Sequence, residues 1–318
     1  MFTYNRQSLC LGERKDEMMR HFDLHCDTLN ECRKLKASLV QNELNVSVER
    51  GMLFDQWVQT FAAFIHDDCR GVKAYRRFLA QVKVLQNAFA QSGKIVPYDP
   101  KNVQEGVCNA ILSVENGAAL GGKLERISEF RELGVRILSL TWNGENELAG
   151  GADSEIGLTA LGKQAVKELE ANRIVIDVSH MNNASFWELC EIAERPFIAT
   201  HSNCFDICPH KRNLDDLQIQ EIIRRGGLIG INFYPIFING ESDASFQELR
   251  GHIRHIVALG GEDVIAVGSD FDGAAALSRL NRIEKIPDWH QNLNKHFDAE
   301  FVDKITFKNA QRFFEENL

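Results

Sequence analysis

Apolar, β-branched segments recur along the chain, and each is followed by a polar cluster and then by a stretch with helical periodicity. Short continuous apolar runs with polar boundaries are typical of buried parallel strands. We predict eight such strands, at residues 21–25, 57–65, 109–115, 135–141, 173–180, 195–201, 228–234 and 264–270. Their spacing averages roughly 35 residues, which is the size of one strand-helix unit.

The segments between the strands carry helix signals. Residues 159–173 begin with a threonine cap and place Leu161, Ala165 and Leu169 on one face, and residues 215–227 end in glycine. The region 64–91 predicts a long helix after the second strand. Eight alternations predict a (β/α)8 TIM barrel, in a single domain over residues 1–318 with a short N-terminal extension. No GxGxxG motif follows an early strand, which disfavours a dinucleotide-binding sheet.

Polar residues of one chemical type follow the apolar runs. In such barrels the chemistry lies at the C-terminal ends of the strands, and those ends carry His25 with Asp27, Glu115, His180, His201 and Asp270. His25 and Asp27 are two residues apart, so on an extended chain their side chains point to the same side. One such residue alone is more often structural, whereas six on one rim predict a metal-dependent active site.

The same residues suit a pair of divalent ions. Mixed nitrogen and oxygen ligands favour zinc or a similar transition ion, and one carboxylate such as Glu115 could bridge two ions. Other polar residues receive structural interpretations: Asp23 orients a ligand, Asp272 orders a turn, and His252 and His255 belong to a helix. Cys26 is predicted to face away from the site and to pack in the core.

Composition narrows the function classes. The chain has 318 residues, 44% of them apolar, and a net charge of −9, which argues against nucleic acid and an anionic membrane surface as partners. Eight cysteines without CxxC pairs, no long apolar run, no signal peptide and no C-terminal anchor predict a cytoplasmic protein without a membrane anchor. The sequence is compatible with a homo-oligomer.

The motifs "FDLHCDTL", "LSVENG", "DVSH", "THSN", "RN" and "GSDFDG" occur in this order, from about residue 20 to the C-terminus. In this the chain resembles the membrane (renal) dipeptidase family, a branch of the amidohydrolase barrels. The resemblance implies an amidohydrolase-like barrel and a metalloprotease with two Zn²⁺ per chain, which cleaves dipeptides by a metal-bridged hydroxide. It also implies a role for each matching residue: His25 and Asp27 bind one zinc, His180 and His201 bind the other, Glu115 bridges them, Asp270 is the acid/base, Arg212 binds substrate, and Tyr234 lines the pocket.

One position departs from the family pattern. Many members have histidine where this chain has Trp142, in "LTWN". The family histidine contacts the substrate carbonyl, so here Asn143 or a metal ion would have to supply that contact. Two alternatives remain at this stage: a related amidohydrolase acting on N-acyl amino acids or lactams, and a binding barrel without catalysis.

Overall fold

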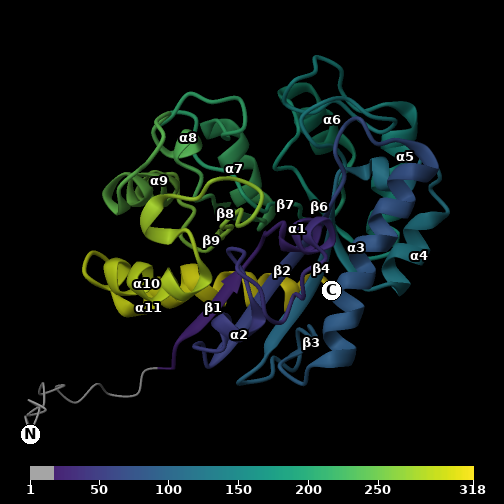
Figure 1. Ribbon diagram of the computed structural model, residues 1–318. Coiled ribbons are helices and arrows are strands. Elements are labelled where there is room, and N and C mark those ends of the chain that lie inside the picture. The colour runs from purple at the N-terminus through teal and green to yellow at the C-terminus, as the bar shows by residue number, and fades with distance from the viewer. Residues whose placement is uncertain (1–17) are drawn as a thin grey trace, which may run out of the picture.

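Eight parallel strands close into a barrel in the computed structural model, which describes residues 18–318 (Figure 1). Hydrogen bonding joins them in chain order and then joins the last strand to the first. The barrel strands are β1 (Arg20–Asp23), β2 (Gln56–Phe64), β4 (Cys108–Glu115), β5 (Val135–Ser139), β6 (Val175–Asp177), β7 (Ile198–Ala199), β8 (Leu228–Ile231) and β9 (Ile265–Val267). The predicted (β/α)8 barrel is therefore confirmed. The single-domain prediction for residues 1–318 remains a prediction, because most of the N-terminal extension lies outside the described residues.

Helices follow the strands and surround the barrel (Figure 1). They are α1 (Thr28–Leu35), α2 (Val48–Gly51), α3 (Gly71–Gln91), α4 (Arg126–Glu132), α5 (Ala160–Ala171), α6 (Asn183–Ile192), α7 (Asp216–Arg225), α8 (Pro235–Ile238), α9 (Phe246–Ala258), α10 (Ile286–Asn294), α11 (Ala299–Asp303) and α12 (Asn309–Asn317). Short 3₁₀ segments occur at Gly117–Leu120, Ser278–Leu280 and Ile283–Lys285, and a π-helical segment at Lys304–Lys308 precedes α12.

The helix ends follow from local chemistry. The Thr159 side chain accepts a hydrogen bond from the Gly162 amide at the start of α5, and Asp215 forms a capping box with Gln218 at the start of α7. α7 ends where Gly226 adopts a left-handed conformation with φ of 66°. The long helix predicted in the region 64–91 is α3, which begins at Gly71, after the turn that follows β2.

All the predicted strands except 109–115 extend too far at their C-terminal ends. β6 stops at Asp177, three residues before His180, and β9 stops at Val267, three residues before Asp270. Local hydrogen bonds bend the chain there: the Ser179 amide donates to the Asp177 carboxylate, and Asp270 has a φ of 59°. Among the predicted site residues only Glu115 lies inside a strand. The other predicted metal ligands, Asp270 and Tyr234 lie within four residues of a strand end, whereas Arg212 lies late in the loop between β7 and α7.

A ninth strand was not predicted. β3 (Ile95–Pro97) pairs with the first half of β4, on the same edge that β5 uses further along β4. It is only three residues long and ends in proline, so it has no periodic signal of its own.

The N-terminal end of the barrel is filled by aromatic packing. Phe22 of β1 stacks on Phe314 of α12, with ring centroids 5.4 Å apart, and Phe307 and Phe313 join the same buried cluster. Apolar residues from all eight barrel strands contribute to this cluster. Because this end is packed, the opposite end, where the strands have their carboxyl termini, is the open mouth.

Two further predictions concern thiols and membranes. Within residues 18–318, seven cysteines are present and all are free, and Cys26 is fully buried in the apolar core, as predicted. None of the helices in this part of the chain combines the length and the apolarity needed to cross a bilayer. The cytoplasmic location stays a prediction.

Candidate metal centre

The predicted site residues converge at the mouth of the barrel. Two groups could each hold a metal ion, and both contain Glu115: one is His25, Asp27 and Glu115, and the other is Glu115, His180 and His201. In each group the ligand atoms lie within 4.8 Å of one another, and every member is buried. The structure thus brings together five residues from four segments that are far apart in the sequence.

The distances describe a tight cluster. Nε2 of His25 lies 3.2 Å from Oδ2 of Asp27 and 3.7 Å from Oε2 of Glu115. Nε2 of His180 lies 2.7 Å from Oε1 of Glu115 and 2.9 Å from Nε2 of His201. The two carboxylate oxygens of Glu115 therefore face different histidines, as a bridging ligand requires.

The hydrogen bonds of His201 determine which ring nitrogen carries its proton. The Thr200 hydroxyl lies 2.8 Å from Asp177, and since a carboxylate can only accept, the hydroxyl donates there. The same hydroxyl lies 2.8 Å from Nδ1 of His201 and must accept from it. Nδ1 then bears the proton, and Nε2 presents a lone pair to the cluster.

His180 is held in the same way. Its Nδ1 lies 3.0 Å from Oδ1 of Asn143, which can only accept. Its Nε2 therefore also presents a lone pair, towards both Glu115 and His201. Acceptors that face acceptors repel each other unless a cation lies between them, so this donor set fits a metal ion.

The charges of the clustered side chains also indicate a metal ion. Burial, followed by repulsion from Asp27, holds the pKa of Glu115 well above its usual range, and burial raises the pKa of Asp270 to about 6. Burial alone would lower the pKa of His25, but Glu115, Asp27 and Asp270 outweigh it and raise that pKa to about 10. Oδ1 of Asp27 and Oε2 of Glu115 are buried without a hydrogen-bond partner. These carboxylates need a compensating cation, and divalent ions fit that need.

Asp23 supports the ligand-bearing backbone from below. Its carboxylate accepts hydrogen bonds from the amide of His25, the amide and hydroxyl of Ser269, and the side chain of Gln59. One buried carboxylate thereby ties the loop after β1 to the loop after β9. Asp272 was predicted to order its own turn, but its carboxylate instead accepts from the Thr28 hydroxyl and from the amides of Asn45 and Val46, and so joins this turn to a distant part of the chain.

Asp270 lies against the metal ligands. It forms a third group with His25 and His201 whose ligand atoms also lie within 4.8 Å of one another, and its Oδ2 accepts from Asn232 at 3.0 Å. The backbone at Asp270 is left-handed, a conformation that costs a non-glycine residue free energy and is often found at functional sites. Its position is compatible with an acid/base residue and with a metal ligand.

Arg212 and Tyr234 line a cavity of about 690 Å³ that also contains Glu115, His180 and Asp270. The guanidinium of Arg212 is buried, and none of its three nitrogens has a hydrogen-bond partner. Burial lowers the pKa of Arg212 to about 10, so the side chain is still a cation at neutral pH. An unpaired buried cation in a cavity predicts an anionic ligand group.

Trp142 and Asn143 follow β5 and line the same cavity. The ring of Trp142 lies edge-on to Phe64, with centroids 5.1 Å apart, and its centroid is 6.3 Å from that of His180. The Asn143 side-chain oxygen is engaged by His180, so this residue positions a ligand.

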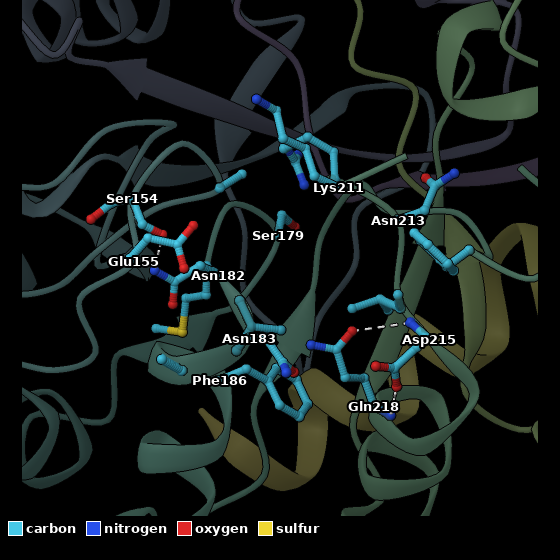
Figure 2. Close-up of a pocket in the computed structure, with 17 residues that line it drawn as sticks. Ser154, Glu155, Ser179, Asn182, Asn183, Phe186, Lys211, Asn213, Asp215 and Gln218 are labelled. Atoms are coloured by element: carbon cyan, nitrogen blue, oxygen red, sulfur yellow. Dashed lines mark hydrogen bonds between the residues drawn. The ribbon is translucent and has the colours of Figure 1, made fainter. Parts of the chain in front are cut away.

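A second cavity, of about 310 Å³, shares Lys211 and Arg212 with the first in its lining. Figure 2 shows Ser154, Glu155 and Asn182 on one side of it, and Asp215 and Gln218, joined by their capping hydrogen bond, on the other. Its lining consists largely of loop residues and the first turns of α6 and α7.

The sequence pattern did not indicate Thr200 or Asn232, although each contacts a predicted site residue. Asn143 was predicted, as one of two possibilities, to contact the substrate carbonyl, and its side-chain oxygen lies against Nδ1 of His180. Thr200 and Asn143 lie beside residues that the sequence singled out, in "ATHSN" and "LTWN". A metal-ligating histidine needs an acceptor for its other ring N–H, and an oxygen-bearing side chain beside a singled-out residue was the available signal.

The chain matches the family described as "Membrane dipeptidase (Peptidase family M19)" over residues 14–317. A Klebsiella pneumoniae protein, named "Uncharacterized protein in pqqA 5'region", is 32% identical over 66% of this chain and 82% of its own length. A Schizosaccharomyces pombe protein, named "Uncharacterized dipeptidase C965.12", is 30% identical over 56% of this chain, and the match spans only 45% of that longer relative.

A solved structure has a similar fold. It is a metallo peptidase from Rhodobacter sphaeroides, liganded with a phosphinate mimic of the dipeptide L-Ala-D-Ala. The two structures superpose with a TM-score of 0.87 over 95% of this chain and 100% of the other, at 22% sequence identity.

Proposed function

Because the chain belongs to the membrane dipeptidase family, peptidase family M19, we propose that it is a binuclear zinc dipeptidase with Asp270 as its acid/base residue. Membership makes it a metal-dependent hydrolase of peptide bonds, and this sets aside the alternative of a binding barrel without catalysis. We propose in addition that the metal is zinc, that two ions bind, that each site residue has the role given below, and that the substrate is a dipeptide.

The observation that carries the proposal is the position of Glu115 between two ligand groups. One carboxylate oxygen faces His25, and the other faces His180. A carboxylate shared in this way suits a pair of ions about 3.5–4 Å apart, as in two-metal hydrolytic sites. Histidine nitrogen and carboxylate oxygen together favour zinc.

A dipeptide fits the charge of the cavity. Arg212 would pair with the C-terminal carboxylate of the substrate through two parallel N–H···O hydrogen bonds. This arrangement favours short peptides, whose carboxylate lies one residue from the scissile bond. The dipeptide mimic bound to the Rhodobacter sphaeroides relative supports the same substrate class.

When bound, the two ions would polarise the peptide carbonyl and lower the pKa of a water, so that it can attack near neutral pH. Asp270 would take the proton from the attacking water and deliver it to the nitrogen of the departing amine. Asn143 and Thr200 would keep the Nδ1 protons of His180 and His201 in place, so that both Nε2 atoms stay free to bind metal. The packed aromatic end of the barrel leaves the mouth as the route for substrate.

The test combines metal analysis with a substrate panel. After loading with zinc and dialysis, elemental analysis should find two ions per chain, and His180→Ala and His201→Ala should lose metal and activity. His255→Ala is the matched control, since His255 pairs with Asp216 away from the site and should keep both ions. The panel contains L-Ala-L-Ala, L-Ala-D-Ala and N-acetyl-L-alanine. Hydrolysis of N-acetyl-L-alanine alone, or full metal retention by both site variants, would overturn the proposal.

A further inference from the structure

One wall of the large cavity is aromatic. Phe64, His66 and Trp142, here called the aromatic wall, all line the cavity and contact one another. The Trp142 centroid lies 5.1 Å from that of Phe64 and 5.0 Å from that of His66. None of the three is fully buried, so part of their ring surface is open to the cavity. Partly exposed rings beside a charged metal centre form a contact surface for an apolar ligand group.

Hydrogen bonds and close packing join the loops that carry the aromatic wall. The Asp67 carboxylate accepts hydrogen bonds from the Gly144 amide and from the Asn116 side chain, which ties the loop after β2 to the loop after β5. Gly151 packs so closely on Trp142 that a Cβ atom there would lie 1.9 Å from the Trp142 carbonyl oxygen. A surface fixed before the ligand arrives loses little conformational entropy on binding.

The aromatic wall lies across the barrel from Arg212, which in the proposed function binds the substrate carboxylate. Around the closed barrel the strand order is β1, β2, β4, β5, β6, β7, β8, β9. In a ring of eight, β2 stands across from β7, and β4 stands across from β8. Phe64 and His66 come from the end of β2, and Trp142 follows β5, whereas Arg212 and Tyr234 belong to the loops after β7 and β8. Glu115, at the end of β4, lies beside the aromatic wall.

We propose that the aromatic wall is the subsite for the N-terminal side chain of the dipeptide, and that it selects large apolar side chains, aromatic ones above all. This rests on the proposed function, in which Arg212 holds the C-terminal carboxylate. A dipeptide anchored at Arg212 and crossing the metal ligands has its N-terminal residue on the side of β2 and β5. Trp142 is the residue that determines the preference, because its indole contacts both other rings and adjoins His180. A ligand ring can pack on it edge-to-face or offset-stacked.

The experiment compares kcat/KM for two dipeptide series with the zinc-loaded enzyme. In the first series the N-terminal residue is Phe, Leu, Ala, Glu or Lys before a constant Ala, and in the second series the order is reversed. Phe-Ala should exceed Ala-Ala by on the order of 10-fold or more, because an apolar pocket discriminates by the area that it buries. Trp142→Ala should abolish most of this ratio, and Trp142→Phe should keep part of it. Trp187→Ala, a tryptophan on α6 outside the cavity lining, should leave the ratio unchanged.

A binding measurement separates this inference from the proposed function. Calorimetric titration with phosphinate analogues of Phe-Ala and Ala-Ala reports on the aromatic wall even if no dipeptide is hydrolysed. Tighter binding of the Phe analogue, lost in Trp142→Ala, supports the inference. Equal affinity for the two analogues, a preference for Glu-Ala, or a Trp142-dependent preference found only in the reversed series would overturn it.

Discussion

At the scale of single residues, the site depends on which atoms carry protons and which charges lack partners. Thr200 and Asn143 each accept an Nδ1 proton and so direct an Nε2 lone pair towards Glu115. Arg212 is a buried cation without a hydrogen-bond partner, and Asp270 is a buried carboxylate with one hydrogen bond, from Asn232. In the proposed function the first two residues prepare metal binding, and the last two act on the substrate.

Replacing Asp270 by asparagine tests proton transfer. Asp270→Asn keeps the shape of the side chain but cannot take a proton, so kcat should fall by roughly 10²–10⁴-fold while the metal stays bound. Asp272→Asn is the control: its carboxylate holds backbone amides of the neighbouring loop, so its loss should lower the melting temperature with less effect on kcat. A folded, zinc-replete Asp270→Asn enzyme with near-normal kcat would exclude the acid/base role.

Replacing Arg212 by lysine tests carboxylate recognition. Lysine keeps the positive charge but lacks the planar fork that pairs with both carboxylate oxygens, so KM for dipeptides should rise more than kcat falls. Arg250→Lys is the control, because Arg250 is also buried but contacts Asn292. Steady-state kinetics on one dipeptide measures both variants, and an unchanged KM in Arg212→Lys would assign this arginine to the structure alone.

At the scale of elements, β1 links the metal centre to the opposite end of the barrel. His25 follows β1 at the mouth, and His21 lies near its start, stacked on Phe54 with centroids 4.9 Å apart and 5.5 Å from His290 of α10. Both ring nitrogens of His21 are buried without a partner. Burial, with a further contribution from His290, holds the pKa of His21 well below its usual range, and burial lowers that of His290 to about 4.

These histidines predict an acid-sensitive contact between β1 and α10. As the pH falls below about 6.5, the two histidines become protonated in the unfolded chain but stay neutral in the folded chain. The free energy of unfolding therefore decreases towards about pH 4. His21→Phe removes one such group and should reduce the loss by about 1.4 kcal/mol per pH unit in that window. Urea unfolding of metal-free protein at pH 7.5 and pH 5 measures this, with His255→Phe as the control. Parallel pH profiles for wild type and His21→Phe would contradict the prediction.

At the scale of the whole molecule, we expect metal binding and folding to be coupled. Asp27, Glu115 and Asp270 lie together in the mouth of the barrel, where burial makes their negative charge costly. A ligand that binds only the folded state stabilises it by about 2.7 kcal/mol at one hundred times its dissociation constant. The metal should therefore set the thermal stability of the protein as well as its activity.

Glu115→Gln should stabilise the metal-free protein and destabilise the zinc-loaded protein. Without metal, the variant loses one buried carboxylate and its repulsion from Asp27, so its melting temperature should exceed that of the wild type. With saturating zinc, it lacks the bridging ligand and should melt below the wild type. Scanning calorimetry of wild type and variant, each with chelator and with zinc, measures the four melting temperatures. A variant less stable than the wild type by the same amount in both conditions would show that Glu115 has no part in metal binding.

Much of the architecture is determined by local signals in the sequence. Apolar runs, the Thr159 cap and the αL residue Gly226 predict the alternating elements, because a strand or a helix end depends on neighbours within a few residues. Polar residues placed directly after apolar runs predict the rim, since parallel strands bring their carboxyl ends together. His25, Glu115, His180 and His201 could be selected on that basis.

Other features were decided only by the tertiary structure. β3 exists because it pairs with β4. The aromatic wall unites Trp142 with residues of β2 because the barrel brings the ends of β2 and β5 to the two sides of β4. The unpartnered state of Arg212 depends on every group packed around it. Such contacts join positions far apart in the chain, and no pattern within one segment encodes them.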